Sequence, residues 1–157
     1  MPRTRAAIAG VAAWVETHAR DEALTFVGSS LGGFYACVLA ERVGCRAVLL
    51  NPAVDPAQDL SRHIGETKAW HSDERFFFRA EFIDELRAMT PTRLTDPQRY
   101  FAVIAKGDEV LDWQAMAAMC TGCHMKLLES SDHALSDFDD HLPEVIKFLC
   151  LAPRLTR

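Results

Sequence analysis

The chain has 157 residues, a net charge of −5 and a hydrophobic content of 49%, which predict one folded domain over residues 1–157 and exclude a disordered chain. Its acidic balance and scattered basic residues argue against nucleic acid or an anionic membrane as the main partner. No apolar stretch approaches the ~20 residues of a membrane span, and the first residues lack a signal peptide's apolar centre, so we expect a cytoplasmic protein.

Hydrophobic periodicity predicts helices that alternate with strands. Residues 4–19 carry apolar side chains at the spacing of an amphipathic helix. We expect further helices at 31–42, 112–120 and 142–151, and strands at 24–28, 46–50, 100–105 and 125–128. In the last helix we expect Val145, Ile146 and Leu149 to face inward. Continuous apolar strands between helices indicate an α/β fold, a three-layer α/β/α sandwich around a mostly parallel sheet.

A G-x-S-x-G motif follows the first predicted strand, where residues 27–33 read Val-Gly-Ser-Ser-Leu-Gly-Gly. In such an elbow a strand turns sharply into a helix and leaves one serine, here Ser30, at the apex. We expect Gly28 and Gly32 to provide space, because a side chain there would collide with neighbouring backbone. The amide of Leu31 should lie at the helix N-terminus, ready for a developing oxyanion. The alternative is an ordinary Gly/Ser loop, but the strand before and the helical pattern after favour the elbow.

A serine becomes a strong nucleophile when a histidine takes its proton and a carboxylate holds that histidine. On a nucleophile elbow the chain order is serine, acid, histidine, with each residue on a loop after a strand. Of the six histidines, His133 is the one that follows a late predicted strand. Asp108 follows the strand at 100–105 and is the favoured acid. Three nearby carboxylates are the alternatives: Glu109, Asp112 and Asp132.

Residues 55–97 interrupt the alternation of helices and strands, with far more chain than one crossover helix needs. We interpret this segment as a helical, lid-like insertion over the carboxyl edge of the sheet, where α/β proteins bind ligands. Its aromatic residues are candidates for the wall of an apolar substrate pocket, foremost Phe76, Phe77, Phe78 and Phe82. The alternative is that these rings merely pack the insertion onto the body of the protein.

Five cysteines with irregular spacing fit reduced thiols in a reducing compartment. Cys120-Thr-Gly-Cys123 is a lone C-x-x-C, with no second pair to complete a zinc site. We therefore expect two small, partly buried residues at a turn, and we expect no metal and no cofactor.

Taken together, the motifs resemble the YqiA/YcfP-like esterases of the α/β-hydrolase superfamily over residues 24–150. Four segments carry the resemblance in order and spacing: Val27 to Gly33, Asn51-Pro-Ala-Val54, Gly107-Asp-Glu-Val-Leu-Asp112 and Asp132-His133. The resemblance implies activity on short acyl esters and acyl-CoA thioesters, with Ser30 as nucleophile, Asp108 as acid and His133 as base. It also implies that Asn51-Pro52 is a structural turn beneath the lid.

One feature of the resembled family has no counterpart here. Its members begin with a strand and a His-Gly loop that supplies a second oxyanion amide, whereas Met1-Pro2 leads directly into a helix and no His-Gly pair occurs. We expect an N-terminally shortened domain in which the strand at 24–28 has an exposed edge. Unpaired backbone groups at such an edge favour a homo-oligomer, and a single oxyanion amide predicts slow catalysis.

Two classes of function follow from these observations. The first is a hydrolase that cleaves a small-molecule acyl ester or thioester through an acyl-enzyme on a Ser-Asp-His triad. The second is a catalytically weak relative that acts as a binding or assembly module. A third, minor alternative is another reaction on the same triad, such as cleavage of a C–C bond or a lactone.

Overall fold

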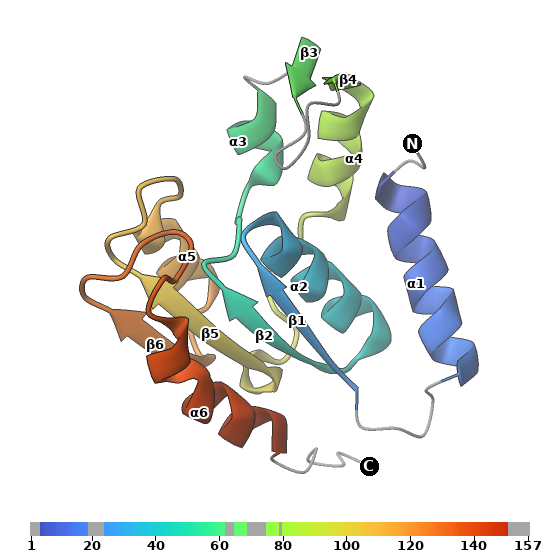
Figure 1. The fold of residues 1–157 in the computed structure, drawn as a ribbon. Helices are drawn as coiled ribbons and strands as arrows, with labels where there is room; N and C mark the ends of the chain where they lie inside the picture. The colour runs from blue at the N-terminus through green and yellow to red at the C-terminus, as the bar shows by residue number, and fades with distance from the viewer. Residues whose placement is uncertain (1–3, 19–23, 62–64, 69–74, 79, 151–157) are drawn as a thin grey trace.

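The computed structural model describes residues 4–18, 24–61, 65–68, 75–78 and 80–150 (Figure 1). Within them the main sheet has the order β1-β2-β5-β6. Its strands are β1 (Thr25–Ser29), β2 (Arg46–Leu50), β5 (Tyr100–Ala105) and β6 (His124–Leu128). Each neighbouring pair is parallel, as the continuous apolar runs predicted.

Helices cover both faces of this sheet. The helices are α1 (Thr4–His18), α2 (Leu31–Val43), α5 (Trp113–Met119) and α6 (Phe138–Cys150). On one face, Leu49 of β2 packs with Met116 of α5 and with small residues of α2. On the other face, Val48 packs with Val145 and Phe148 of α6. The expected three-layer sandwich with a mostly parallel sheet is therefore confirmed, and α1 packs against α2 at its outer side.

The last helix begins earlier than its apolar periodicity suggested. It starts at Phe138, and Asp139 and Asp140 occupy its first turn. Carboxylates near a helix N-terminus are stabilised by the helix dipole, so these residues are a start signal that the apolar pattern misses.

The inward face of α6 also differs from the expectation. Val145 and Phe148 are buried, whereas Ile146 is 48% exposed and Leu149 is 38% exposed. The inward orientation predicted for Ile146 and Leu149 is therefore wrong. The sheet covers α6 from one side, so one narrow stripe of the helix is buried and neighbouring apolar positions stay in contact with solvent.

A long segment of the chain separates β2 from β5. It contains α3 (Pro56–Ser61), β3 (Gly65–Lys68), β4 (Arg75–Phe78), α4 (Ala80–Met89) and a 3₁₀ turn (Pro97–Arg99). Figure 1 shows α3, β3, β4 and α4 together beyond the carboxyl end of β2. The helices were predicted, but the antiparallel pair β3–β4 was not. The run of phenylalanines in β4 has high strand propensity, which explains why this part of the segment forms a strand and not a helix.

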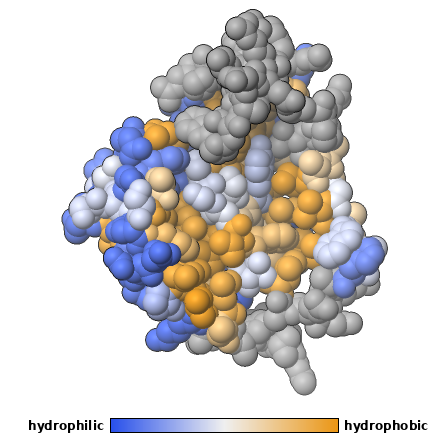
Figure 2. Space-filling view, viewed as in Figure 1, coloured by the Kyte–Doolittle hydropathy of each residue, from blue (hydrophilic) through white to orange (hydrophobic). Residues whose placement is uncertain are grey.

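Strand β1 forms one edge of the main sheet, since it pairs only with β2 among the described residues. Val27 shares a face with its register partner Val48, which packs under α6, yet Val27 is 53% exposed. Figure 2 shows hydrophobic surface over α6 and between α6 and α1. The expected open edge is thus present in the described part of the chain. No helix described there combines the length and the apolar character needed to cross a bilayer.

Candidate active site

Ser30 occupies the turn from β1 into α2 in a conformation that non-glycine residues rarely adopt. Its φ is 54° and its ψ is −122°, a strain of about 1–3 kcal/mol. The Ser30 N–H donates to the carbonyl of Leu50 at 2.9 Å, and the N–H of Ala53 donates to the Ser30 carbonyl at 3.0 Å. The end of β2 and the turn after it therefore hold the strained serine from both sides.

The close packing of this elbow depends on two glycines. A Cβ added at Gly28 would lie 2.1 Å from the carbonyl oxygen of Gly32, so no side chain fits there. At Gly32 a Cβ would meet nothing within 4 Å, and the predicted steric need for Gly32 is therefore wrong. The second crowded position is Gly33, where a Cβ would lie 2.9 Å from the Cβ of Pro52. This contact between the helix and the turn after β2 is not visible in the local motif.

Leu31 is the first residue of α2. Its N–H is therefore among the four that have no acceptor within the helix, at the positive end of the helix dipole. This is the position that the motif predicted for an oxyanion donor.

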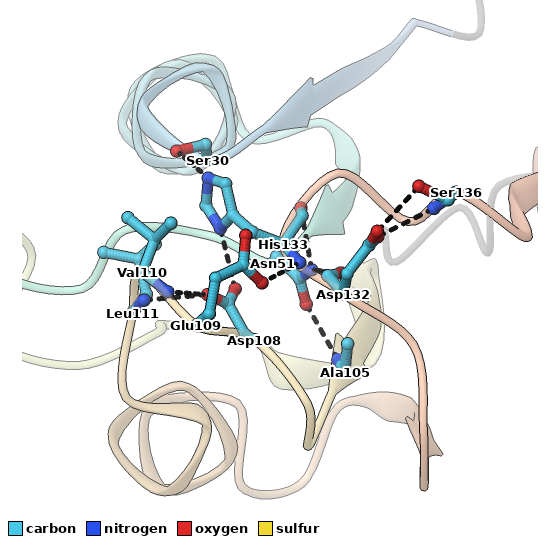
Figure 3. Close-up of polar contacts among 10 residues, drawn as sticks. All are labelled: Ser30, Asn51, Ala105, Asp108, Glu109, Val110, Leu111, Asp132, His133 and Ser136. Atoms are coloured by element: carbon cyan, nitrogen blue, oxygen red, sulfur yellow. Dashed lines mark hydrogen bonds and ion pairs between the residues drawn. The ribbon is translucent and has the colours of Figure 1, made fainter.

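Three side chains from distant loops form one hydrogen-bonded chain (Figure 3). The Nε2 of His133 lies 3.1 Å from the Oγ of Ser30, and its Nδ1 lies 2.8 Å from the Oδ2 of Asp108. The Asp108 side chain is 0% exposed, and its Oδ1 accepts from the N–H groups of Val110 and Leu111, both at 2.8 Å. A carboxylate at Nδ1 favours the tautomer that protonates this nitrogen, which leaves Nε2 free to accept the serine proton.

The alternative acids have other partners. Glu109 accepts from the backbone N–H of His133 at 3.0 Å, not from the ring. Asp112 caps the N-terminus of α5. Asp132 accepts from the N–H and the hydroxyl of Ser136, and the hydroxyl lowers the pKa of the Asp132 carboxyl below its usual value. Of the four carboxylates considered, Asp108 is the one in contact with the imidazole.

The aromatic candidates are placed to different degrees. Phe76, Phe77 and Phe78 belong to β4, but their side chains lie outside the described part of the structure. Phe82 lies on α4 and is partly buried. A role of these rings in a substrate pocket stays a prediction.

The cysteine pair lies within the core next to a turn. Cys120 is fully buried with Cys37, and Cys123 packs against the same cluster. Burial raises the pKa of the Cys37 thiol to about 12, so this thiol stays protonated at neutral pH. A hydrogen bond with Cys123, together with burial, raises the pKa of Cys120. The described residues include no cluster of three or more histidine, cysteine, aspartate or glutamate side chains suited to a metal ion.

One residue in contact with the site was not among the predicted site residues. Asn51, interpreted from the sequence as part of a structural turn, is fully buried and has a positive φ of 40°. Its side-chain amide donates to the carbonyls of Asp132 and His133, each at 3.0 Å. The sequence did contain a signal for this role: an asparagine directly after an apolar strand. A side-chain amide that is buried at such a position needs hydrogen-bond partners.

Comparisons with known proteins agree with this fold. A model of a family described as Uncharacterised protein family (UPF0227) matches residues 2–150. The structure of Est1E from Butyrivibrio proteoclasticus with bound ferulic acid is similar at 16% identity and a TM-score of 0.62, over 91% of this chain and 64% of that chain. XC6422 from Xanthomonas campestris, an α/β serine hydrolase without a lid, is similar at 14% identity and a TM-score of 0.57, over 95% of this chain and 58% of that chain.

A mouse protein, alpha/beta hydrolase domain-containing protein 10, is similar at 18% identity and a TM-score of 0.57, over 88% of this chain and 68% of that chain. The chain thus spans less than two thirds of the length of Est1E and XC6422. At these identities the likeness establishes the α/β-hydrolase fold.

Proposed function

We propose a hydrolytic function for this chain, which belongs to the uncharacterised protein family UPF0227 and has the fold of the α/β hydrolases. The reaction is cleavage of carboxylic esters or acyl thioesters by a serine nucleophile. The observation that carries the proposal is the hydrogen-bonded chain from Asp108 through His133 to the strained Ser30. Packing of the fold does not by itself require a buried carboxylate, a histidine and a serine in this order, whereas acyl transfer does.

In the proposed reaction, the Oγ of Ser30 attacks the acyl carbonyl while Nε2 of His133 takes its proton. Asp108 holds the imidazole and stabilises its charged form. The N–H of Leu31 donates to the oxyanion of the tetrahedral intermediate. His133 then protonates the departing alcohol or thiol, and a water molecule hydrolyses the acyl-serine by the same proton transfers in reverse.

For this chain we propose small acyl esters or thioesters as substrates, with the N–H of Leu31 as one oxyanion donor. Its cysteines are free in the structure, which suits the cytoplasmic location that we include in the proposal.

The exposed edge of β1 favours a second candidate function. Among the described residues β1 pairs on one side only, and its other side, beside the exposed Val27, is a surface on which another chain can add a strand. With this function the protein would be a binding or assembly module, and its triad would contribute little catalytic activity.

Hydrolysis of an activated short-chain ester tests the proposal. The wild type should turn over the ester, and Ser30→Ala should reduce the rate to the level of the buffer. Ser29→Ala is the matched control, because Ser29 is the adjacent residue and is exposed. Equal rates in the wild type and in Ser30→Ala, at equal purity, would leave the assembly module as the better account.

A further inference from the structure

The end of β2 and the short turn after it contact each segment that carries a triad residue. Leu50 of β2 and Ala53 of the turn hold the backbone of Ser30, as described above. The Oδ1 of Asn51 accepts from the N–H of Ala105 at 2.8 Å, at the end of β5 and directly before the loop of Asp108. Its Nδ2 donates to two carbonyls of the loop that carries His133. The end of β2 and its turn therefore join the segments of the nucleophile, the acid and the base. Figure 3 shows the contacts of Asn51 within this arrangement.

The chemistry at this position suits an asparagine. The surroundings require one acceptor and two N–H donors within one small planar group, and a carboxamide supplies that set. Asparagine also tolerates a positive φ better than most residues, and φ here is 40°. The Asn51 side chain is 0% exposed, so no water competes for these bonds.

Other anchors of the His133 loop are more exposed. Glu109, which binds the His133 N–H, is exposed, and Asp132, which binds Ser136, is partly exposed. Hydrogen bonds at the surface are weaker constraints because water replaces them readily. Asn51 is the fully buried side chain that binds the His133 backbone directly.

We propose that Asn51 is a positioning residue of the active site, which fixes the backbone of His133 so that its ring reaches Asp108 and Ser30 at once. The inference rests on the proposed hydrolytic function. The imidazole makes bonds of 2.8 Å and 3.1 Å on opposite sides, so a shift of its backbone lengthens at least one of them. Misplacement of a catalytic group by about 1 Å can cost about 10²-fold in rate.

The test substitutes Asn51→Asp, which keeps the size, the tolerance of positive φ and the acceptor for Ala105. At neutral pH the introduced carboxylate lacks both donors and faces two carbonyl oxygens. We expect kcat to fall at least about tenfold, with KM for a short neutral ester within about twofold of the wild type. Lower pH should raise the ratio of variant to wild-type kcat, because the introduced carboxyl regains one donor when it is protonated.

A control and a spectroscopic readout separate positioning from general stability. Tyr100→Phe removes the partly buried hydrogen bond from Tyr100 to Glu41 at the opposite end of β5 and should leave kcat unchanged. The Nδ1 proton of His133 should give a low-field proton NMR signal in the wild type that Asp108→Asn abolishes. In Asn51→Asp we expect this signal to be weakened or lost.

A folded Asn51→Asp protein with kcat within about twofold of the wild type and an unchanged NMR signal would overturn the proposal. If Asn51→Asp does not fold, the same measurements apply to Asn51→Gly, which adopts a positive φ without strain. If neither variant folds, Asn51 is a determinant of the fold, and the positioning role is also refuted. If the wild type hydrolyses no ester, the proposed function fails, while the NMR signal still decides whether Asn51 positions His133.

Discussion

Ser30 and Asp108 each hold a state that is unfavourable in isolation. Ser30 has a positive φ, and the Asp108 carboxylate is completely withdrawn from solvent. A buried carboxylate needs partners, and Asp108 has the His133 ring and two backbone N–H groups. The strained Ser30 and the buried Asp108 both contact the imidazole of His133. Acyl transfer would use a strained nucleophile and a buried carboxylate at these positions.

Substitutions in the triad should show that its members act as a unit. We predict that His133→Ala and Asp108→Asn each lower kcat by about 10²–10⁴, and that the double variant is little worse than either single variant. Steady-state and pre-steady-state ester kinetics measure this.

Asp112→Asn is the matched control for the acid, because asparagine still caps α5. The choice of Asp108 is mistaken if Asp108→Asn stays active while Glu109→Gln or Asp112→Asn is inactive. That outcome would leave the rest of the triad intact.

The buried thiol of Cys37 predicts a loss of stability at alkaline pH. Its folded-state pKa is about 12, above the ordinary value of 9.0, mainly because of burial. Its contribution is therefore complete below pH 9.0 and is lost as the pH rises toward about 12, since the unfolded chain releases the proton first. Across this window one such group lowers the free energy of unfolding by about 1.4 kcal/mol per pH unit.

Urea unfolding at a series of alkaline pH values measures this loss, and Cys37→Ala should flatten the pH dependence. An equally steep decline in Cys37→Ala would assign the effect to other groups. Tyr100 and Cys120 are the ones to consider, because the fold raises the pKa of each, Tyr100 mainly by burial and Cys120 by its hydrogen bond with Cys123 together with burial.

At the scale of elements, the insertion between β2 and β5 is the part of the chain that could determine substrate choice. It lies beyond the carboxyl end of β2, the edge where Ser30 and Asn51 also lie. Its helix α4 packs against the body through Ile83 and Leu86. Other side chains of α4, Phe82 among them, are more exposed than these two.

We predict that Phe82→Ala changes the preference between long and short acyl chains. One methylene in an apolar pocket is worth roughly 1–3 kcal/mol, so a pocket residue shifts the ratio of kcat/KM values visibly. The measurement compares esters of increasing acyl length, and it extends to Phe76, Phe77 and Phe78 one at a time. Ile83→Val is the control for a change in the packing of the insertion. Identical chain-length profiles in all four phenylalanine variants would exclude these rings from the pocket wall.

The main-sheet strands were predictable because local sequence determines them. Arg46–Leu50 and Tyr100–Ala105 are continuous apolar runs that end at turn residues, and both match the structure residue for residue. The pair β3–β4 was missed because a charged, aromatic segment shows neither strand alternation nor helical periodicity.

The candidate site was predictable where chain order constrains it and unpredictable where long-range packing decides. Ser30, Asp108 and His133 follow from strand ends in a fixed order, and their side chains meet. The role of Gly33 depends on Pro52, and the contacts of Asn51 lie 54, 81 and 82 residues away along the chain. Backbone partners at such separations leave no pattern in a single sequence.

At the scale of the whole molecule, the two helical layers are unequal. One face of the sheet carries α2 and α5, while α6 covers the other. The edge strand β1 keeps Val27 largely exposed on the α6 face. Exposed apolar surface beside unpaired strand groups is a site at which chains associate.

We therefore predict that the protein self-associates through β1 in a concentration-dependent manner. Light scattering after size exclusion measures the mass, and Val27→Lys should shift the protein toward monomer, because a charged edge strand disfavours pairing. In hydrogen-exchange measurements, the amides of residues 25–29 that point away from β2 should be protected from exchange only in the associated form. A wild type that stays monomeric at high concentration with these amides well protected would contradict the prediction.

The most direct test of the central claim is covalent labelling with a fluorophosphonate, followed by intact-mass and peptide mass spectrometry. The proposed mechanism predicts one adduct per chain, on the Oγ of Ser30, formed much more slowly in His133→Ala and absent in Ser30→Ala. A folded wild-type protein that takes up no label, or takes it up on another serine, would contradict a catalytic triad in this chain.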